Sequence, residues 1–125
     1  MTQLSRTQLE HHARHWINAW NAHDIEAVIS AFSDDAVFIS PLAAQVTGNG
    51  RIAGIDALRR YWTEALGRVP DLRFDLDSFA IDETRQTVTV FYVSRAGGRV
   101  RRASEHMVFR DGKQVLGEAY YGVEE

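Results

Sequence analysis

The spacing of apolar residues changes once along the chain, near Asp71, and this change constrains the fold more than any other feature. Before Asp71, apolar residues recur at helical spacing, which predicts helices over residues 5–21, 25–33 and 55–69. After Asp71 they alternate with polar residues, which predicts four long strands in succession between residues 72 and 122. The pattern therefore predicts an α+β fold in which helices precede the sheet.

Two short turns decide how the long strands pair. Ala96-Gly97-Gly98 separates the second long strand from the third, and Asp111-Gly112 separates the third from the fourth. Such turns join antiparallel strands, because parallel neighbours need a crossover of about a dozen residues or more. The helices are the elements available to cover the apolar face of this sheet. We therefore expect a cone-shaped, curved antiparallel sheet wrapped over three N-terminal helices, with a pocket at the open end of the cone.

Shorter elements complete the predicted fold. Asp24 is well placed to cap the second helix, and Asp34-Asp35 is predicted to form a turn. Residues 36–40 are predicted to form a short strand that stops at Pro41, because proline has no N–H to donate to a neighbouring strand. Residues 42–54 contain several glycines and few large apolar side chains, so they are predicted to form a loop.

Composition restricts the classes of function. A chain of 125 residues that is 45% apolar predicts one domain over residues 1–125, with one core. The net charge of −3 leads us to expect no nucleic-acid partner. The absence of cysteine excludes disulfides and thiolate chemistry. The N-terminus is polar and no apolar run is long enough to cross a membrane, so we expect a cytoplasmic protein without membrane contact.

Four short motifs occur in an order and spacing typical of one family. They are AWNAHD at 19–24, SDDAV at 33–37, GIDAL at 54–58 and DGKQV at 111–115. Together they resemble the SnoaL-like and ketosteroid-isomerase-like branch of the nuclear transport factor 2 superfamily, over about residues 9–122. The resemblance implies the cystatin-like α+β barrel of that superfamily. It leaves the activity open, because members include isomerases, polyketide cyclases, dehydratases, epoxide hydrolases and non-catalytic binders.

Glu105 is the candidate catalytic residue. Strand alternation places it on the same face as Met107 and Phe109, which we expect to be the face covered by the helices. A carboxyl group in an apolar cavity has a raised pKa, so it can transfer a proton near neutral pH or donate a hydrogen bond as a neutral acid. By resemblance to the isomerases, Glu105 takes the place of the acid that donates to the developing oxyanion. The alternative is that Glu105 lies near the sheet edge and pairs with Arg101 or another arginine.

The remaining isomerase positions carry other residues here. By resemblance, Ser40 stands at the position of the catalytic base, and a serine hydroxyl is not a base near neutral pH. Trp16 stands at the position of the tyrosine that donates to the oxyanion, and its indole lacks the acidity of a phenol. Phe32 and Trp62 stand at the positions of two supporting tyrosines. We therefore expect no authentic ketosteroid isomerase.

Large rings with a few polar groups predict a pocket for a small hydrophobic ligand that is flat or cyclic. The residues predicted to bind it are Trp16, Phe32, Phe38, Ser40, Tyr61, Trp62, Met107 and Tyr121, with Phe109 as a further ring. The alternative is that these rings fill the cone as core. We expect no cofactor and no metal, because His11 and His15 lie one helical turn apart but lack an acidic partner.

The outer face of the sheet is predicted to carry Val88, Val90 and Tyr92 together with His106 and Val108. A face this apolar is typical of an interface, so we expect a homodimer. Two functions remain open. The protein is either an isomerase, cyclase or hydro-lyase that uses Glu105 for proton transfer, or a non-catalytic module that binds a hydrophobic molecule or another protein.

Overall fold

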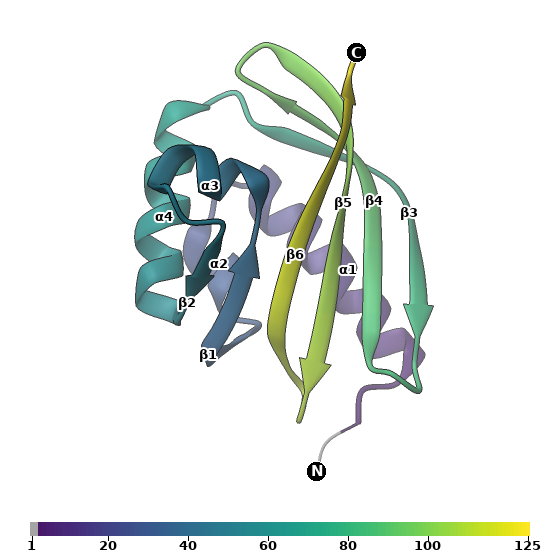
Figure 1. The fold of residues 1–125 in the computed structure, drawn as a ribbon. Coiled ribbons are helices and arrows are strands. Elements are labelled where there is room, and N and C mark those ends of the chain that lie inside the picture. Colours follow the sequence, from purple (N-terminus) through teal and green to yellow (C-terminus); the bar gives the residue numbers. More distant parts are fainter. Residues whose placement is uncertain (1–2) are drawn as a thin grey trace.

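A computed structural model describes residues 3–125, and Figure 1 shows its arrangement. The helices of this part of the chain are α1 (Arg6–Asn21), α2 (Ile25–Ile29), α3 (Pro41–Thr47) and α4 (Ile55–Arg68). The strands are β1 (Phe32–Ile39), β2 (Arg51–Ala53), β3 (Arg73–Asp82), β4 (Thr87–Ala96), β5 (Arg99–Arg110) and β6 (Lys113–Glu124). They form one sheet in the order β2-β1-β6-β5-β4-β3, which confirms the α+β prediction. Figure 1 shows α1 lying across one face of the long strands, with the other helices beside β1 and β2.

The N-terminal helix begins where its sequence can satisfy its free N–H groups. The Ser5 hydroxyl accepts a hydrogen bond from the backbone N–H of Gln8 at 3.1 Å, and the Gln8 side chain accepts one from the Ser5 N–H at 2.8 Å. This reciprocal pair is a capping box. Asp24 likewise accepts from the N–H of Ala27 and caps α2, as predicted. The buried stripe of α1 faces the sheet and includes Trp16 and Trp20.

Both predicted hairpins are confirmed, and their turns explain the pairing. Gly97 and Gly98 have φ values of 63° and 76°, and Asp111 and Gly112 have values of 52° and 80°. Two consecutive positive φ angles are typical of the type I′ turn, whose twist matches that of an antiparallel pair. The turns therefore set β4 antiparallel to β5, and β5 antiparallel to β6.

The region between α2 and α4 differs from the prediction. Helix α2 ends at Ile29, and the following strand begins at Phe32, so residues 34–35 lie within β1 rather than in a turn. Residues 42–54 contain helix α3 and strand β2 rather than a plain loop. The described chain thus has four helices where three were expected. Strand β1 pairs parallel to β6 and antiparallel to β2, so the sheet is mixed at this side.

Helix α3 forms for local reasons that the sequence contains. The Ser40 hydroxyl accepts from the backbone N–H groups of Leu42 and Ala43, and Pro41 occupies the first turn, where its missing N–H does no harm. Gly48 ends the helix in the left-handed conformation, with φ of 82°. Ser40, which directly follows β1, is therefore the N-cap of α3.

The predicted outer face was wrong for Val88, Val90 and Tyr92, which are buried on the inner face. Val90 lies directly opposite Glu105, and residues opposite one another in adjacent strands share a face. The turn has two residues, Gly97 and Gly98, between the paired Ala96 and Arg99, and this count sets the register. The outer face of β4 instead carries Thr89, Phe91 and Val93, with His106 and Val108 beside them on β5, as predicted for those two.

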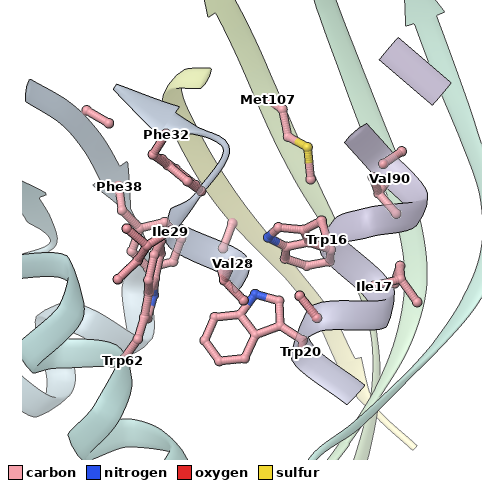
Figure 2. Packing of buried hydrophobic residues seen from close by; sticks show 14 of the residues in the cluster. Trp16, Ile17, Trp20, Val28, Ile29, Phe32, Phe38, Trp62, Val90 and Met107 are labelled. Carbon is pink, nitrogen blue, oxygen red and sulfur yellow. The ribbon is translucent and has the colours of Figure 1, made fainter. Parts of the chain in front are cut away.

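The core lies between the inner sheet face and the helices. Figure 2 shows Trp16 and Trp20 projecting from α1 toward the side chains of α2, β1 and α4. The rings of Trp20 and Trp62 meet edge to face with 5.6 Å between centroids, and those of Phe32 and Trp62 with 5.4 Å. Within residues 3–125, no helix is long and apolar enough to cross a membrane. The cytoplasmic location stays a prediction.

Candidate functional site

A cavity of about 240 Å³ lies between the inner face of the sheet and helices α1 and α4. Its more exposed lining residues, such as Leu42 and Arg99, lie where α3 and the β4–β5 hairpin meet solvent, so this end is its mouth. The volume is slightly below the roughly 300–1,000 Å³ of drug-sized pockets, which suits a small ligand. The lining residues are Trp16, Trp20, Phe38, Ser40, Leu42, Tyr61, Trp62, Ala65, Leu66, Val69, Leu72, Phe74, Tyr92, Ser94, Ala96, Arg99, Arg101, Glu105 and Tyr121.

The structure brings most of the predicted site residues together at this cavity. Those that line it are Glu105, Trp16, Phe38, Ser40, Tyr61, Trp62 and Tyr121. They come from α1, β1, the N-cap of α3, α4, β5 and β6, so the fold gathers residues that are far apart in the sequence. Their contacts with a ligand stay a prediction.

Phe32 and Met107 do not line the cavity. Phe32 is 3% exposed and packs edge to face on Trp62, while Met107 is fully buried between Val88 of β4 and Gly117 of β6. Phe109 is also buried core, beside the ring of His12. These side chains are therefore packing residues, because other side chains fill the space that a ligand would need.

Glu105 lies on the inner face of β5, with 1% of its surface exposed. Its Oε2 atom is buried and has no hydrogen-bond partner among the described residues. Gly117 gives this carboxyl group room: a Cβ atom there would lie 2.7 Å from Oε2 and 3.2 Å from Gln114 Nε2. A methyl group at position 117 would overlap the carboxyl oxygen, so glycine is needed here for close approach.

The surroundings of Glu105 favour its neutral form. Burial raises the pKa of Glu105 to about 8, and the Glu118 carboxylate adds to the rise. The alternative pairing with Arg101 is absent, because the Arg101 guanidinium lies 3.6 Å from Glu124 instead. Glu105 is therefore mostly protonated at neutral pH and can donate a hydrogen bond into an apolar cavity.

Two phenols lie close enough to Glu105 to feel its charge, and one of them was missed by the sequence analysis. Burial raises the pKa of Tyr92 well above its usual range, with Tyr121 and Glu105 adding to the rise. Burial also raises the pKa of Tyr121, again with a contribution from Glu105. Counting outward from the Gly97–Gly98 turn would have placed Tyr92 on the face of Glu105. Both phenols stay neutral near pH 7, so they can donate hydrogen bonds.

Trp20 is a second lining residue that the sequence analysis did not select. Its indole Nε1 is buried and has no hydrogen-bond partner among the described residues. Its position four residues after Trp16 on the buried stripe of α1 was the available signal. Beside it, Trp16 stacks on Phe74 with 5.3 Å between centroids and meets Tyr92 edge to face at 5.2 Å. This wall is flat, apolar and aromatic, with an indole N–H close by.

Ser40 lines the cavity, but its hydroxyl oxygen is already in use. It accepts from the N–H of Leu42 at 3.1 Å and from the N–H of Ala43 at 3.5 Å, which caps α3. A hydroxyl that accepts two backbone hydrogen bonds is no proton acceptor for a substrate. Among residues 3–125, no group of three His, Cys, Asp or Glu side chains is arranged to hold a metal ion.

Comparison with known proteins places the chain in a family. Residues 13–116 match the family model of the SnoaL-like domain. A SnoaL-like protein of unknown function from Burkholderia thailandensis is 32% identical in sequence, with a TM-score of 0.83, and the match covers 96% of this chain and 99% of that one. No curated protein matches the sequence.

Two more distant structures share the fold. A putative ketosteroid isomerase from Kribbella flavida is 16% identical with a TM-score of 0.77, over 94% of this chain and 79% of that one. TerC, which was co-crystallised with polyporic acid, is 16% identical with a TM-score of 0.78, over 92% of each chain. At these identities the likeness shows the fold alone.

Proposed function

Since the chain belongs to the SnoaL-like domain family, as its motifs predicted, we propose that it binds a small hydrophobic, cyclic ligand in the cavity and that Glu105 acts on this ligand as a neutral acid. One observation carries the proposal. In the described part of the chain, two buried side-chain atoms lack a hydrogen-bond partner, Trp20 Nε1 and Glu105 Oε2, and both belong to residues that line this cavity. Because buried polar groups are normally paired, a ligand with polar atoms facing them accounts for both.

The chemistry follows from the state of the proton on Glu105. A protonated carboxyl group donates to a ligand carbonyl oxygen and stabilises negative charge that develops on that oxygen. The neutral phenols of Tyr92 and Tyr121 lie near the same carboxyl group and can support it. This arrangement suits proton-transfer reactions of the isomerase, cyclase or hydro-lyase type. The co-crystallisation of TerC with polyporic acid supports ligand binding within this fold.

A second function, binding without catalysis, is favoured by the state of Ser40. The position of the isomerase base holds a hydroxyl that caps α3, and the described cavity lining contains one carboxyl group and no imidazole. In a reaction that removes a proton from carbon, the ionised form of Glu105 would have to accept that proton, and the same carboxyl group would have to donate it back.

The test uses 1-tetralone, a bicyclic ketone with one acceptor oxygen and exchangeable α-protons. All three tryptophans of the chain line the cavity, so their fluorescence reports ligand entry directly. Quenching by 1-tetralone that saturates supports binding, and exchange of its α-protons in D₂O supports catalysis. Glu105→Gln keeps a hydrogen-bond donor but not the transferable proton, so it should retain binding and lose exchange. Binding without exchange in the natural protein leaves the non-catalytic function, and no saturable quenching rejects the proposed site.

We also propose that the protein forms a homodimer through the outer face of the sheet, although Val88, Val90 and Tyr92 do not belong to that face. Phe91 is 40% exposed and Tyr120 is 51% exposed, and both lie on this face. Arg102 and Asp77 add charges of both signs to the same face, which suits contact between two identical surfaces. Sedimentation at micromolar concentration should give a dimer for the natural protein and a monomer for Phe91→Glu. A natural protein that sediments as a monomer contradicts the proposal.

A further inference from the structure

The mouth of the cavity carries two arginines. Arg99 and Arg101 lie on β5 on the same face as Glu105, because every second residue of a strand shares a face. The Arg101 side chain is 28% exposed and its guanidinium lies over the ring of Tyr121, 5.9 Å from its centroid. Arg102, the residue after Arg101, points to the outer face, where its guanidinium lies 3.6 Å from Asp77. The two cavity arginines are thus placed by the strand at the edge of an otherwise apolar site.

The positive charge of these two arginines is only partly compensated. The Glu124 carboxylate lies 3.6 Å from a nitrogen of Arg99 and 3.6 Å from a nitrogen of Arg101, through the same oxygen. Both distances exceed the roughly 2.7–2.9 Å of a charge-assisted hydrogen bond. Glu105, the one carboxyl group in the described lining, is mostly neutral at pH 7. The Asp71 carboxylate at the rim is occupied by the N–H groups of Gly97 and Gly98. The guanidinium groups of Arg99 and Arg101 therefore keep N–H groups that are free to donate to an anionic ligand.

We propose that the ligand is an organic anion whose rings enter the cavity and whose carboxylate binds Arg101, with Arg99 beside it, at the mouth. This inference rests on the proposed function, since it names the ligand class of the same site. Arg101 and Glu105 are four residues apart on one strand, so their Cα atoms are separated by about 13 Å. A ligand that reaches both carries its anionic group and its acceptor oxygen at opposite ends of a flat apolar body.

The experiment compares 2-naphthoate with 2-naphthamide, which share their rings and differ in charge. Quenching of tryptophan fluorescence at low ionic strength gives both dissociation constants. We expect 2-naphthoate to bind about tenfold more tightly, as a charge-assisted hydrogen bond at a partly exposed site allows. Arg101→Met should remove most of this preference, whereas Arg101→Lys should keep part of it. Arg102→Met, which removes the outward-facing neighbour, should leave it unchanged, and added salt should reduce it.

The outcomes separate the two proposals. Equal binding of the two compounds to the natural protein overturns the anion inference and leaves the proposed function standing. A preference that survives in Arg101→Met also overturns it, because the charge would then be recognised elsewhere. Failure of both compounds, and of 1-tetralone, to quench the fluorescence rejects the cavity as a binding site and the inference with it.

Discussion

The space over the inner face of β5 is packed with side chains at one end and open at the other. Met107 is fully buried and lies between Val88 and Gly117, among side chains that leave no room for a ligand. Glu105, only two residues away on the same face, borders a cavity of about 240 Å³. Phe109 packs beside the ring of His12 at the Met107 end, and Trp16 meets Tyr92 at the cavity, so the presence of aromatic rings does not distinguish a packed core from a binding site.

The two ends contribute differently to the stability of the fold. Within residues 3–125, the packed end buries apolar surface and holds no buried side-chain polar atom that lacks a partner. The open end holds a buried carboxyl group and an indole N–H that lack partners among the described residues. Each such group destabilises the folded state unless a ligand satisfies it. We infer that the packed end supports the fold and that the open end carries a cost in stability typical of functional sites.

The largest expected effect is the pH dependence that Glu105 imposes on stability. Its folded-state pKa of about 8 lies above the ordinary value of 4.5, so the folded state binds more protons than the unfolded state. The contribution of Glu105 to the free energy of unfolding is then fully present below about pH 4.5. It declines by about 1.4 kcal/mol per pH unit as the pH rises to about 8. The total loss is on the order of 5 kcal/mol.

Glu105→Gln lacks the titrating group and should not show this loss. Urea denaturation of both proteins from pH 5 to pH 9 gives the difference, in which the titration of all other groups cancels. The variant should become progressively more stable than the natural protein as the pH rises. A difference that stays constant over this range would show that Glu105 ionises as freely in the folded protein as in the unfolded chain.

The next effect compares truncation at the two ends. Met107→Ala at the packed end should lower the free energy of unfolding by about 2–5 kcal/mol, because it leaves a hole that the neighbours cannot fill. Leu66→Ala at the cavity should cost less than about 1.5 kcal/mol, because Leu66 is only partly buried and borders open space. Equal losses in chemical denaturation would mean that the two ends are packed alike.

A smaller effect is expected from filling the space beside Glu105. Gly117→Ala puts a methyl group 2.7 Å from Glu105 Oε2, which should cost about 1–3 kcal/mol and displace the carboxyl group. Gly67→Ala is the matched control, since a Cβ there meets no atom within 4 Å and Gly67 lies in α4. The control should gain roughly 0.5–1 kcal/mol from reduced backbone freedom in the unfolded chain. Were Gly117→Ala as stable as the natural protein, the close approach would be unimportant.

The smallest effect concerns the rim of the mouth. The Asp71 carboxylate accepts from the N–H groups of Gly97 at 2.9 Å and Gly98 at 3.2 Å, which ties the β4–β5 turn to the end of α4. These hydrogen bonds lower the pKa of Asp71, so the tie is present above its ordinary value of 3.8 and is lost as the pH falls below it. Asp71→Ala should speed amide exchange at Gly97 and Gly98, and not at Gly112 in the other turn. Unchanged exchange would show that the tie does not hold the rim.

Much of the fold could be predicted from local patterns. The change of period at Asp71 and the turns at Gly97–Gly98 and Asp111–Gly112 are properties of neighbouring residues, and all three describe the structure correctly. Glu105 was placed on the inner face by alternation along its own strand. These predictions succeed because the physics behind them acts within a few residues.

The errors arose where a prediction needed a count or a long-range contact. Alternation along β4 does not by itself show which face the helices cover, and the pairing of Tyr92 with Ala103 across the Gly97–Gly98 turn puts Tyr92 on the inner face. Phe32 fits a helical spacing but joins β1, because pairing with β6 outweighs its local pattern. The division between Met107 in the core and Tyr121 at the cavity depends on how distant elements pack. No spacing in the sequence contains that information.

The most direct test of the account is the ionisation of Glu105 itself. In protein labelled with ¹³C at the glutamate side-chain carboxyl carbons, the signal missing from Glu105→Gln identifies this residue. Its chemical shift is then followed against pH. The account predicts a midpoint at about 8, with the carboxyl group protonated at pH 6. A midpoint near 4.5 would contradict it, because the carboxylate would then be exposed to water or paired, and no neutral acid would face the cavity.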